Sequence, residues 1–197
     1  MSGDILDELA ADHEDTRQLF GAFTGRGFHD PERKHLVDRA TTTLLQQAHI
    51  EETYLYPVAR TLPGGEALTR QGVAENTEIE ALLSELSHSD QDTPGFERVV
   101  AQLVERATGH ANHEEAALFP MVRSEVPAEE LAQLGMKARA EKAHLPGHPR
   151  SGTAALPPDD LPAPERNLAG RMRSLFSSAG PGRDQLRPAV PSPETSA

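Results

Sequence analysis

Before Pro146, apolar residues recur at intervals of three and four, and no stretch alternates apolar and polar residues over the length of a β-strand. This spacing predicts four long helices separated by short turn-forming segments, with a shorter fifth helix after Pro127. The four long helices are expected over residues 4–23, 32–57, 66–86 and 95–121. Four helices with short connections and one apolar stripe each pack most simply as an antiparallel up-down-up-down bundle. The sequence therefore predicts an all-α fold.

The composition changes at Pro146. Ten of the sixteen prolines fall within the last 52 residues, together with many Gly, Ser and Ala. Such a segment cannot bury enough apolar surface to offset the entropy of ordering it, so a mostly disordered tail is expected. Residues 165–177 alone have a helical apolar spacing, which predicts one short amphipathic helix that docks on the bundle or, as the weaker alternative, on a membrane or partner. We therefore divide the chain into a helical bundle, 1–145, and a Pro-rich tail, 146–197.

Charge and cysteine content narrow the class of protein. Residues 1–145 hold 13 basic and 26 acidic residues, a net charge of −13, which argues against nucleic-acid binding and is compatible with binding cations. The absence of Cys removes disulfides and thiolate metal sites and fits a reducing compartment. The N-terminus is acidic where an export signal would be basic, and no apolar run reaches the roughly 18 residues that span a bilayer. A cytoplasmic protein without a membrane span is expected.

Polar residues interrupt the apolar stripes near the middle of each long helix. The six residues at these inward positions are His13, Gln47, Glu51, Asn76, His110 and Glu114. Residues four apart lie about 40° apart around a helix, so Gln47 and Glu51 point the same way, as do His110 and Glu114. Glutamate is rarely buried without a partner, so two inward glutamates require a metal ion or a network of ion pairs.

An internal repeat supports a shared central site. Residues 51–60 match residues 114–123, and both read Glu-Glu-x-x-Leu-aromatic-Pro-x-x-Arg. In this register Gln47 aligns with His110. The bundle is therefore expected to consist of two similar helical hairpins around one site, an arrangement by which helical bundles hold iron or manganese.

Over about residues 4–142 the chain resembles the bacterial hemerythrin-like, or HHE cation-binding, family. That family carries a His on its first helix, a His-x-x-x-Glu on its second, a His on its third and a His-x-x-x-Glu on its fourth. His13 matches the first-helix ligand, Glu51 matches the second-helix glutamate, and His110 with Glu114 matches the fourth-helix pair. The resemblance implies a non-haem iron site with these four residues as ligands and a role in oxygen binding or sensing, iron handling or oxidative-stress chemistry.

Two positions depart from the family pattern. Gln47 replaces the histidine of the second helix, and Asn76 replaces the histidine of the third. Disturbing even an outer partner of a metal ligand typically lowers metal affinity about 10–100-fold, so the loss of two imidazoles should cost at least as much. The resemblance therefore implies a degenerate site, with Gln47 and Asn76 as weak or lost ligand positions.

Three functions remain open on the sequence alone. In the first, the protein binds a cation, either iron in a mono- or dinuclear site or manganese, and through it O2 or another small diatomic molecule. In the second, it is a metal-free helical scaffold or interaction module with no cofactor, in which His13 and His110 as imidazolium ions balance Glu51 and Glu114. The third and weakest is an enzyme that carries out peroxide or nitric-oxide chemistry at an iron with fewer ligands, since no catalytic triad or phosphate-binding loop is present. The protein partner is unknown.

Two further histidines lie close in sequence to the predicted ligands but are not expected to be ligands themselves. His49 lies about 200° around the helix from Gln47, so we expect it to be exposed to solvent. His113 lies off the line of His110 and is expected at the rim of the site or on the surface.

Overall fold

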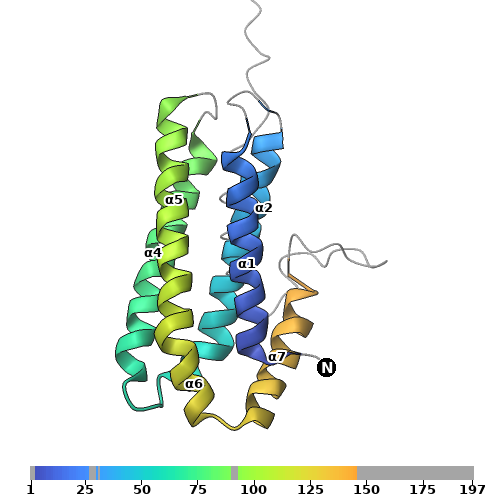
Figure 1. The fold of residues 1–197 in the computed structure, drawn as a ribbon, viewed down its shortest axis with the longest axis vertical. Helices are drawn as coiled ribbons and strands as arrows, with labels where there is room; N and C mark the ends of the chain where they lie inside the picture. The colour runs from blue at the N-terminus through green and yellow to red at the C-terminus, as the bar shows by residue number, and fades with distance from the viewer. Residues whose placement is uncertain (1–2, 27–29, 31, 90–92, 146–197) are drawn as a thin grey trace, which may run out of the picture.

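The computed structural model describes residues 3–26, 30, 32–89 and 93–145, and within them every regular element is helical (Figure 1). Four rods form the bundle, and a fifth helix packs beside it. The rods are α1 (Ile5–Thr24); α2 (Glu32–Ile50) continued by η1 (Glu51–Leu55) and α3 (Tyr56–Ala59); α4 (Gly65–His88); and α5 (Pro94–His113) continued by η2 (Glu114–Leu118) and α6 (Phe119–Glu125). The fifth helix is α7 (Ala128–Lys142). The predicted all-α bundle with a short fifth helix is confirmed.

Local sequence signals set the ends of these helices. The Asp4 side chain accepts hydrogen bonds from the backbone N–H groups of Leu6 and Asp7, which would otherwise lack partners in the first turn of α1. The turn between α3 and α4 requires glycine twice. Gly64 has φ 81°, and a Cβ atom on Gly65 would lie 1.7 Å from the carbonyl oxygen of Ala59. The chain can therefore reverse direction within a few residues between α3 and α4.

The apolar interior is divided into two clusters by a polar layer. One cluster is formed by the Thr24 end of α1 and the neighbouring ends of the other rods, and its largest members include Phe20, Phe23, Leu83 and Phe96. The other lies at the opposite end, where α3, α6 and α7 meet the start of α1, and includes Ile5, Leu9, Leu55 and Leu118. The six inward polar residues predicted above lie between the two clusters on every rod, and each is at most 3% exposed. Their burial follows from the helical register.

The fifth helix covers part of the bundle that a four-helix arrangement would leave open. α7 packs against α1 and also contacts α2, beside the lower part of α1 in Figure 1. The contact is close, because a Cβ atom on Gly135 would lie 2.7 Å from the backbone of Asp4. This helix overturns the expectation that His49 is exposed: the side chain is buried at 6% exposure, and its Nε2 lies 2.5 Å from Glu141 Oε1 of α7.

The second rod ends at Ala59, close to the end predicted near Pro57. Its last part consists of the π-helical turn η1 and of α3, which begins at Tyr56 and carries Pro57 in its first turn. Proline is tolerated in the first turn of a helix, where its missing N–H has no intrahelical partner. The predicted tail, 146–197, and its helix at 165–177 lie outside the described residues. Among the described helices, none is long and apolar enough to cross a membrane.

Candidate metal centre

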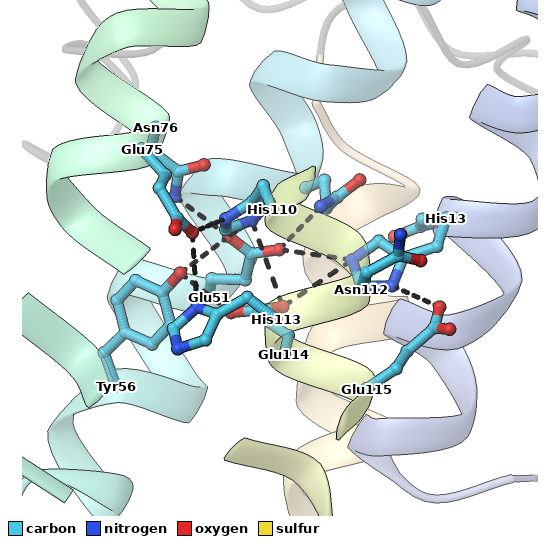
Figure 2. Close-up of polar contacts among 12 residues, drawn as sticks. His13, Glu51, Tyr56, Glu75, Asn76, His110, Asn112, His113, Glu114 and Glu115 are labelled. Atoms are coloured by element: carbon cyan, nitrogen blue, oxygen red, sulfur yellow. Dashed lines mark hydrogen bonds and ion pairs between the residues drawn. The ribbon is translucent and has the colours of Figure 1, made fainter. Parts of the chain in front are cut away.

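The structure brings His13, Glu51, His110 and Glu114 together in the polar layer. One potential ligand atom from each of the four lies within 4.8 Å of the others. His13 Nε2 is 3.6 Å from Glu114 Oε2, and His110 Nε2 is 3.4 Å from Glu51 Oε2. Figure 2 shows the four side chains converging from three rods. The histidines and glutamates singled out by the sequence thus form a single buried cluster.

Each histidine is oriented by a second carboxylate outside the cluster. His13 Nδ1 lies 2.8 Å from Glu115 Oε1, and His110 Nδ1 lies 3.0 Å from Glu75 Oε2. Because each Nδ1 faces a carboxylate, it carries a proton, and each Nε2 is turned towards the centre of the cluster. A metal-bound histidine is typically held in this way, by a carboxylate on its other nitrogen. Glu75 and Glu115 were not identified from the sequence, although each directly precedes or follows a predicted inward residue.

The two amides that replace family histidines both donate hydrogen bonds to Glu51. Gln47 Nε2 lies 2.8 Å from Glu51 Oε1, and Asn76 Nδ2 lies 2.9 Å from Glu51 Oε2. In this arrangement the amides present nitrogen, not a ligand oxygen, to the centre. Gln47 and Asn76 therefore fix the position of the Glu51 carboxylate.

An aromatic residue from each half of the internal repeat also reaches the cluster. The Tyr56 hydroxyl shares its proton between Glu114 Oε1 at 2.8 Å and Glu51 Oε2 at 3.1 Å (Figure 2). Its counterpart Phe119 stacks on the His13 ring, with the centroids 5.7 Å apart and the planes 3° from parallel. Gly72 makes room for the tyrosine, since a Cβ atom there would lie 2.5 Å from the Tyr56 oxygen.

The π-helical turns explain how these aromatic residues reach the site. The Tyr56 N–H bonds to the Glu51 carbonyl and the Phe119 N–H bonds to the Glu114 carbonyl, five residues apart in each case. In an α-helix, residues five apart point about 140° away from each other, but a π-helical turn places them on nearly the same face. Tyr56 was missed because α-helical geometry was assumed for the whole rod. The signal that was available is the repeated aromatic-Pro pair after each Glu-Glu.

Burial and mutual charge divide the cluster into charged and neutral groups. Burial alone lowers the pKa of His110, but the carboxylate of Glu51 outweighs it and raises that pKa to about 11. Burial likewise opposes the charge on Glu51, yet the His110 ring holds the pKa of this carboxyl down to about 2. Burial and the nearby charge of Glu51 together raise the pKa of Glu114, whereas burial lowers the pKa of His13. Without metal, His110 and Glu51 therefore form an ion pair, and burial favours the neutral forms of the His13 imidazole and the Glu114 carboxyl.

The metal-free alternative was predicted to contain two imidazolium ions and two carboxylates. The directions of the pKa shifts favour that pairing for His110 with Glu51, and oppose it for His13, whose pKa burial lowers, and for Glu114, whose pKa burial and Glu51 raise. Three buried atoms of the cluster have no hydrogen-bond partner, namely His13 Nε2, Glu114 Oε2 and His110 Nε2, the last of which faces Glu51 only as an ion pair at 3.4 Å. Buried polar atoms are nearly always satisfied, so three such atoms facing one another form a donor set that could hold a cation.

His113 lies at the edge of this cluster. Its side chain is 15% exposed, and its Nδ1 is 3.3 Å from Glu75 Oε2, the oxygen that also faces His110. It lies outside the four-residue group, as expected for a rim residue.

Comparison with known proteins supports the resemblance stated above. The family model described as Hemerythrin HHE cation binding domain matches residues 4–122. A crystal structure of a hemerythrin HHE cation binding domain-containing protein from Mycobacterium kansasii superposes with a TM-score of 0.67 at 20% identity, covering 89% of this chain and 98% of that one. A protein described as a DNA nickase, from Nostoc sp. (strain PCC 7120 / SAG 25.82 / UTEX 2576), is 27% identical over 142 residues, 72% of this chain and 40% of that protein. The chain thus spans less than half the length of this relative. Since the family model covers more than half of the chain, the chain belongs to the hemerythrin HHE cation binding domain family.

Proposed function

We propose that the protein binds a transition-metal cation, iron or alternatively manganese, through His13, Glu51, His110 and Glu114. The observation that carries this proposal is the convergence of four buried ligand groups within 4.8 Å, three of which present an atom that no hydrogen bond satisfies. A polar group buried without a partner lowers stability, and a bound cation would supply the missing partner for all three at once.

The chemistry of the donor set favours these metals. Imidazole nitrogen together with carboxylate oxygen suits iron and manganese, and the absence of Cys leaves no thiolate donor. With Gln47 and Asn76 turned to Glu51 as hydrogen-bond donors, the protein offers four ligands. Such a centre keeps coordination positions for small molecules and would supply a Lewis acid or a redox-active ion. This supports a role in oxygen or redox sensing or in iron handling, in the cytoplasm.

The second candidate function is a metal-free scaffold, and the bonding of Glu51 favours it. This carboxylate has Gln47, Asn76 and Tyr56 as hydrogen-bond donors and His110 as a counter-ion, so half of the cluster is satisfied without metal. Nicking of DNA is not part of either proposal, because residues 1–145 carry a net charge of −13 and phosphate contacts need a basic face.

Metal analysis tests the proposal. The protein is purified without a metal-affinity tag, loaded anaerobically with Fe²⁺ or Mn²⁺, desalted and assayed for metal, in parallel with His110→Ala and Glu114→Ala. Glu66→Ala, whose side chain is 65% exposed, is the matched control. We expect metal near one or two ions per chain in the wild type and Glu66→Ala and its loss in the two cluster variants. Chelator should also lower the melting temperature, because ligand binding stabilises the native state. If the wild-type protein retains no metal, the metal-binding proposal is refuted and the metal-free scaffold is the remaining function.

A further inference from the structure

A groove of about 340 Å³ lies between α4 and α5, away from the metal cluster. It follows residues 78–85 of α4 and 102–106 of α5, and none of the four proposed metal ligands lines it. These two helices lie on the opposite side of the bundle from α7 (Figure 1). Ala81 and Leu82 supply apolar surface to the groove. The proposed metal centre therefore leaves this part of the molecule without an assigned role.

Both walls of the groove carry carboxylates. Glu78 and Glu85 belong to the α4 wall, and Glu105 belongs to the α5 wall. Arg106 Nε lies 3.4 Å from Glu78 Oε2, so this arginine compensates the charge of Glu78. Within the described part of the chain, Glu85 and Glu105 have no ion-pair partner. One uncompensated negative charge on each wall favours a ligand that brings positive charge to both.

The segment 165–177 carries the complementary pattern, although it lies outside the described residues. Its apolar residues follow one another at helical spacing: Leu168, Met172, Leu175 and Phe176. In a helix of this register, Arg171 lies about 40° from Leu175 on one side of the apolar stripe. Arg173 lies about 60° from Phe176 on the other side. The expected helix therefore has an apolar stripe with a basic residue on each side, and the groove combines apolar surface with an acidic residue from each wall.

The size of the groove and the length of the linker permit docking. An apolar cavity of about 150 Å³ admits a benzene ring, so a groove of about 340 Å³ has room for two side chains such as Met172 and Phe176. Residues 146–164 connect the segment to Leu145, and these 19 residues reach about 60 Å when extended. With 24 residues, α4 is about 36 Å long, so the linker can carry the segment to the far side of the bundle.

We propose that residues 165–177 dock as a helix in this groove. The apolar stripe packs on Ala81 and Leu82. Arg171 faces one acidic wall and Arg173 faces the other. An isolated helix of this length is marginal in water, so burial of its stripe stabilises it. A membrane is the poorer surface, because binding to anionic lipid typically takes about four to eight Lys or Arg, and the segment holds three Arg and one Glu. Docking covers an exposed face of α4 and α5 and does not require the metal.

Disulfide trapping in the full chain tests this docking, because the chain has no Cys of its own. One cysteine replaces Ala169, at the edge of the expected stripe, and the second replaces Gln102, an exposed residue of the groove. The reference pair combines Ala169→Cys with Ala140→Cys, at an exposed position on α7. Because the tail follows directly after α7, an undocked segment would meet position 140 at least as often as position 102. Each rate of intramolecular disulfide formation is divided by the reactivity of the same thiols towards a small reagent.

Charge reversal tests whether the acidic walls direct the docking. Four sets of substitutions are added to both cysteine pairs: Arg171→Glu with Arg173→Glu; Glu85→Lys with Glu105→Lys; these two sets together; and, as the matched control beyond the segment, Arg183→Glu with Arg187→Glu. We expect the disulfide at position 102 to form about tenfold or more faster than the one at position 140. Each reversal alone should lower this ratio about 3–10-fold, because opposite charges become like charges. The combined reversal should restore the ratio, and the control should leave it unchanged.

Three results would overturn the proposal. The first is an equal rate at positions 102 and 140, which would mean that the segment does not dock in the groove. The second is a combined reversal that does not restore the ratio. The third is the formation of disulfide-linked dimers in place of linked monomers, which would assign the groove to the segment of a second copy of the chain. All samples are kept free of metal, so each result is independent of the proposed metal-binding function.

Discussion

Gly72→Ala tests whether Tyr56 is held against the two glutamates. A Cβ atom at position 72 would lie 2.5 Å from the tyrosine oxygen and 2.9 Å from its Cζ, both shorter than real Cβ contacts. The ring must therefore move away from Glu51 and Glu114. Alanine would otherwise be favoured, because it is the better helix former by about 1 kcal/mol.

The expected magnitude follows from these opposing terms. Overpacking a buried site costs about 1–3 kcal/mol. Leaving buried carboxyl oxygens without the hydroxyl costs about 1–3 kcal/mol more. Subtracting the gain of about 1 kcal/mol in helix propensity leaves a net loss of about 1–5 kcal/mol in the free energy of unfolding. Urea denaturation of the metal-free protein, followed by circular dichroism, measures this quantity.

A control and a double mutant separate the packing effect from helix propensity. A Cβ atom on Gly109 of α5 would meet nothing within 4 Å, so Gly109→Ala should stabilise the protein by up to about 1 kcal/mol. In a Tyr56→Phe background the oxygen is gone, and Gly72→Ala should cost clearly less, with a coupling energy of about 0.5–3 kcal/mol. If Gly72→Ala stabilises the protein as much as Gly109→Ala does, Tyr56 is not confined by Gly72 and the reasoning is refuted.

Three further predictions concern the cluster itself. Asn76→His should raise Mn²⁺ or Fe²⁺ affinity about 10-fold or more in a metal titration, because it restores a family imidazole; equal affinity would contradict a lost ligand position. His13→Ala should weaken binding at pH 7 more than His110→Ala, because burial lowers the pKa of His13 and so favours its metal-binding neutral form, whereas His110, with a pKa of about 11, must first lose a proton. The pKa of Glu51 is about 2 against an ordinary 4.5, so its ionised form stabilises the metal-free protein fully above pH 4.5, and this stabilisation is lost as the pH falls towards 2. The urea midpoint of the wild type should therefore fall with pH between 4.5 and 2, and that of Glu51→Gln should fall less.

The sequence predicted the parts of this structure that depend on helical periodicity. Rods, turns and all six inward polar positions follow from the spacing of apolar residues, and Gln47, for instance, is buried where its register places it. His49 was misplaced because its environment depends on α7, whose packing partner cannot be read from the pattern on α2. A residue opposite the core stripe is buried when another helix covers it, and that is a property of tertiary packing.

The missed site residues have a different cause. Tyr56 lies on the wrong face of an ideal α-helix, and only the π-helical turn that starts at Glu51 brings its hydroxyl to the carboxylates. Glu75 and Glu115 are partly exposed, so no hydrophobic pattern marks them, and their importance appears only when His110 and His13 are seen beside them. Periodicity identifies buried ligands more readily than the groups that orient them.

The two halves of the internal repeat share a backbone design but not the same chemistry. Each half contributes a glutamate at the start of a π-helical turn and an aromatic residue five positions later. In the first half, the charge of His110 holds the pKa of Glu51 at about 2, and Gln47 and Asn76 donate hydrogen bonds to the same carboxylate. In the second, Tyr56 donates to Glu114 Oε1, but Oε2 has no hydrogen-bond partner, and burial together with the charge of Glu51 raises the pKa of Glu114. Two of the three unsatisfied atoms of the cluster, Glu114 Oε2 and His13 Nε2, therefore lie 3.6 Å apart, and the proposed cation would supply the missing partner of both.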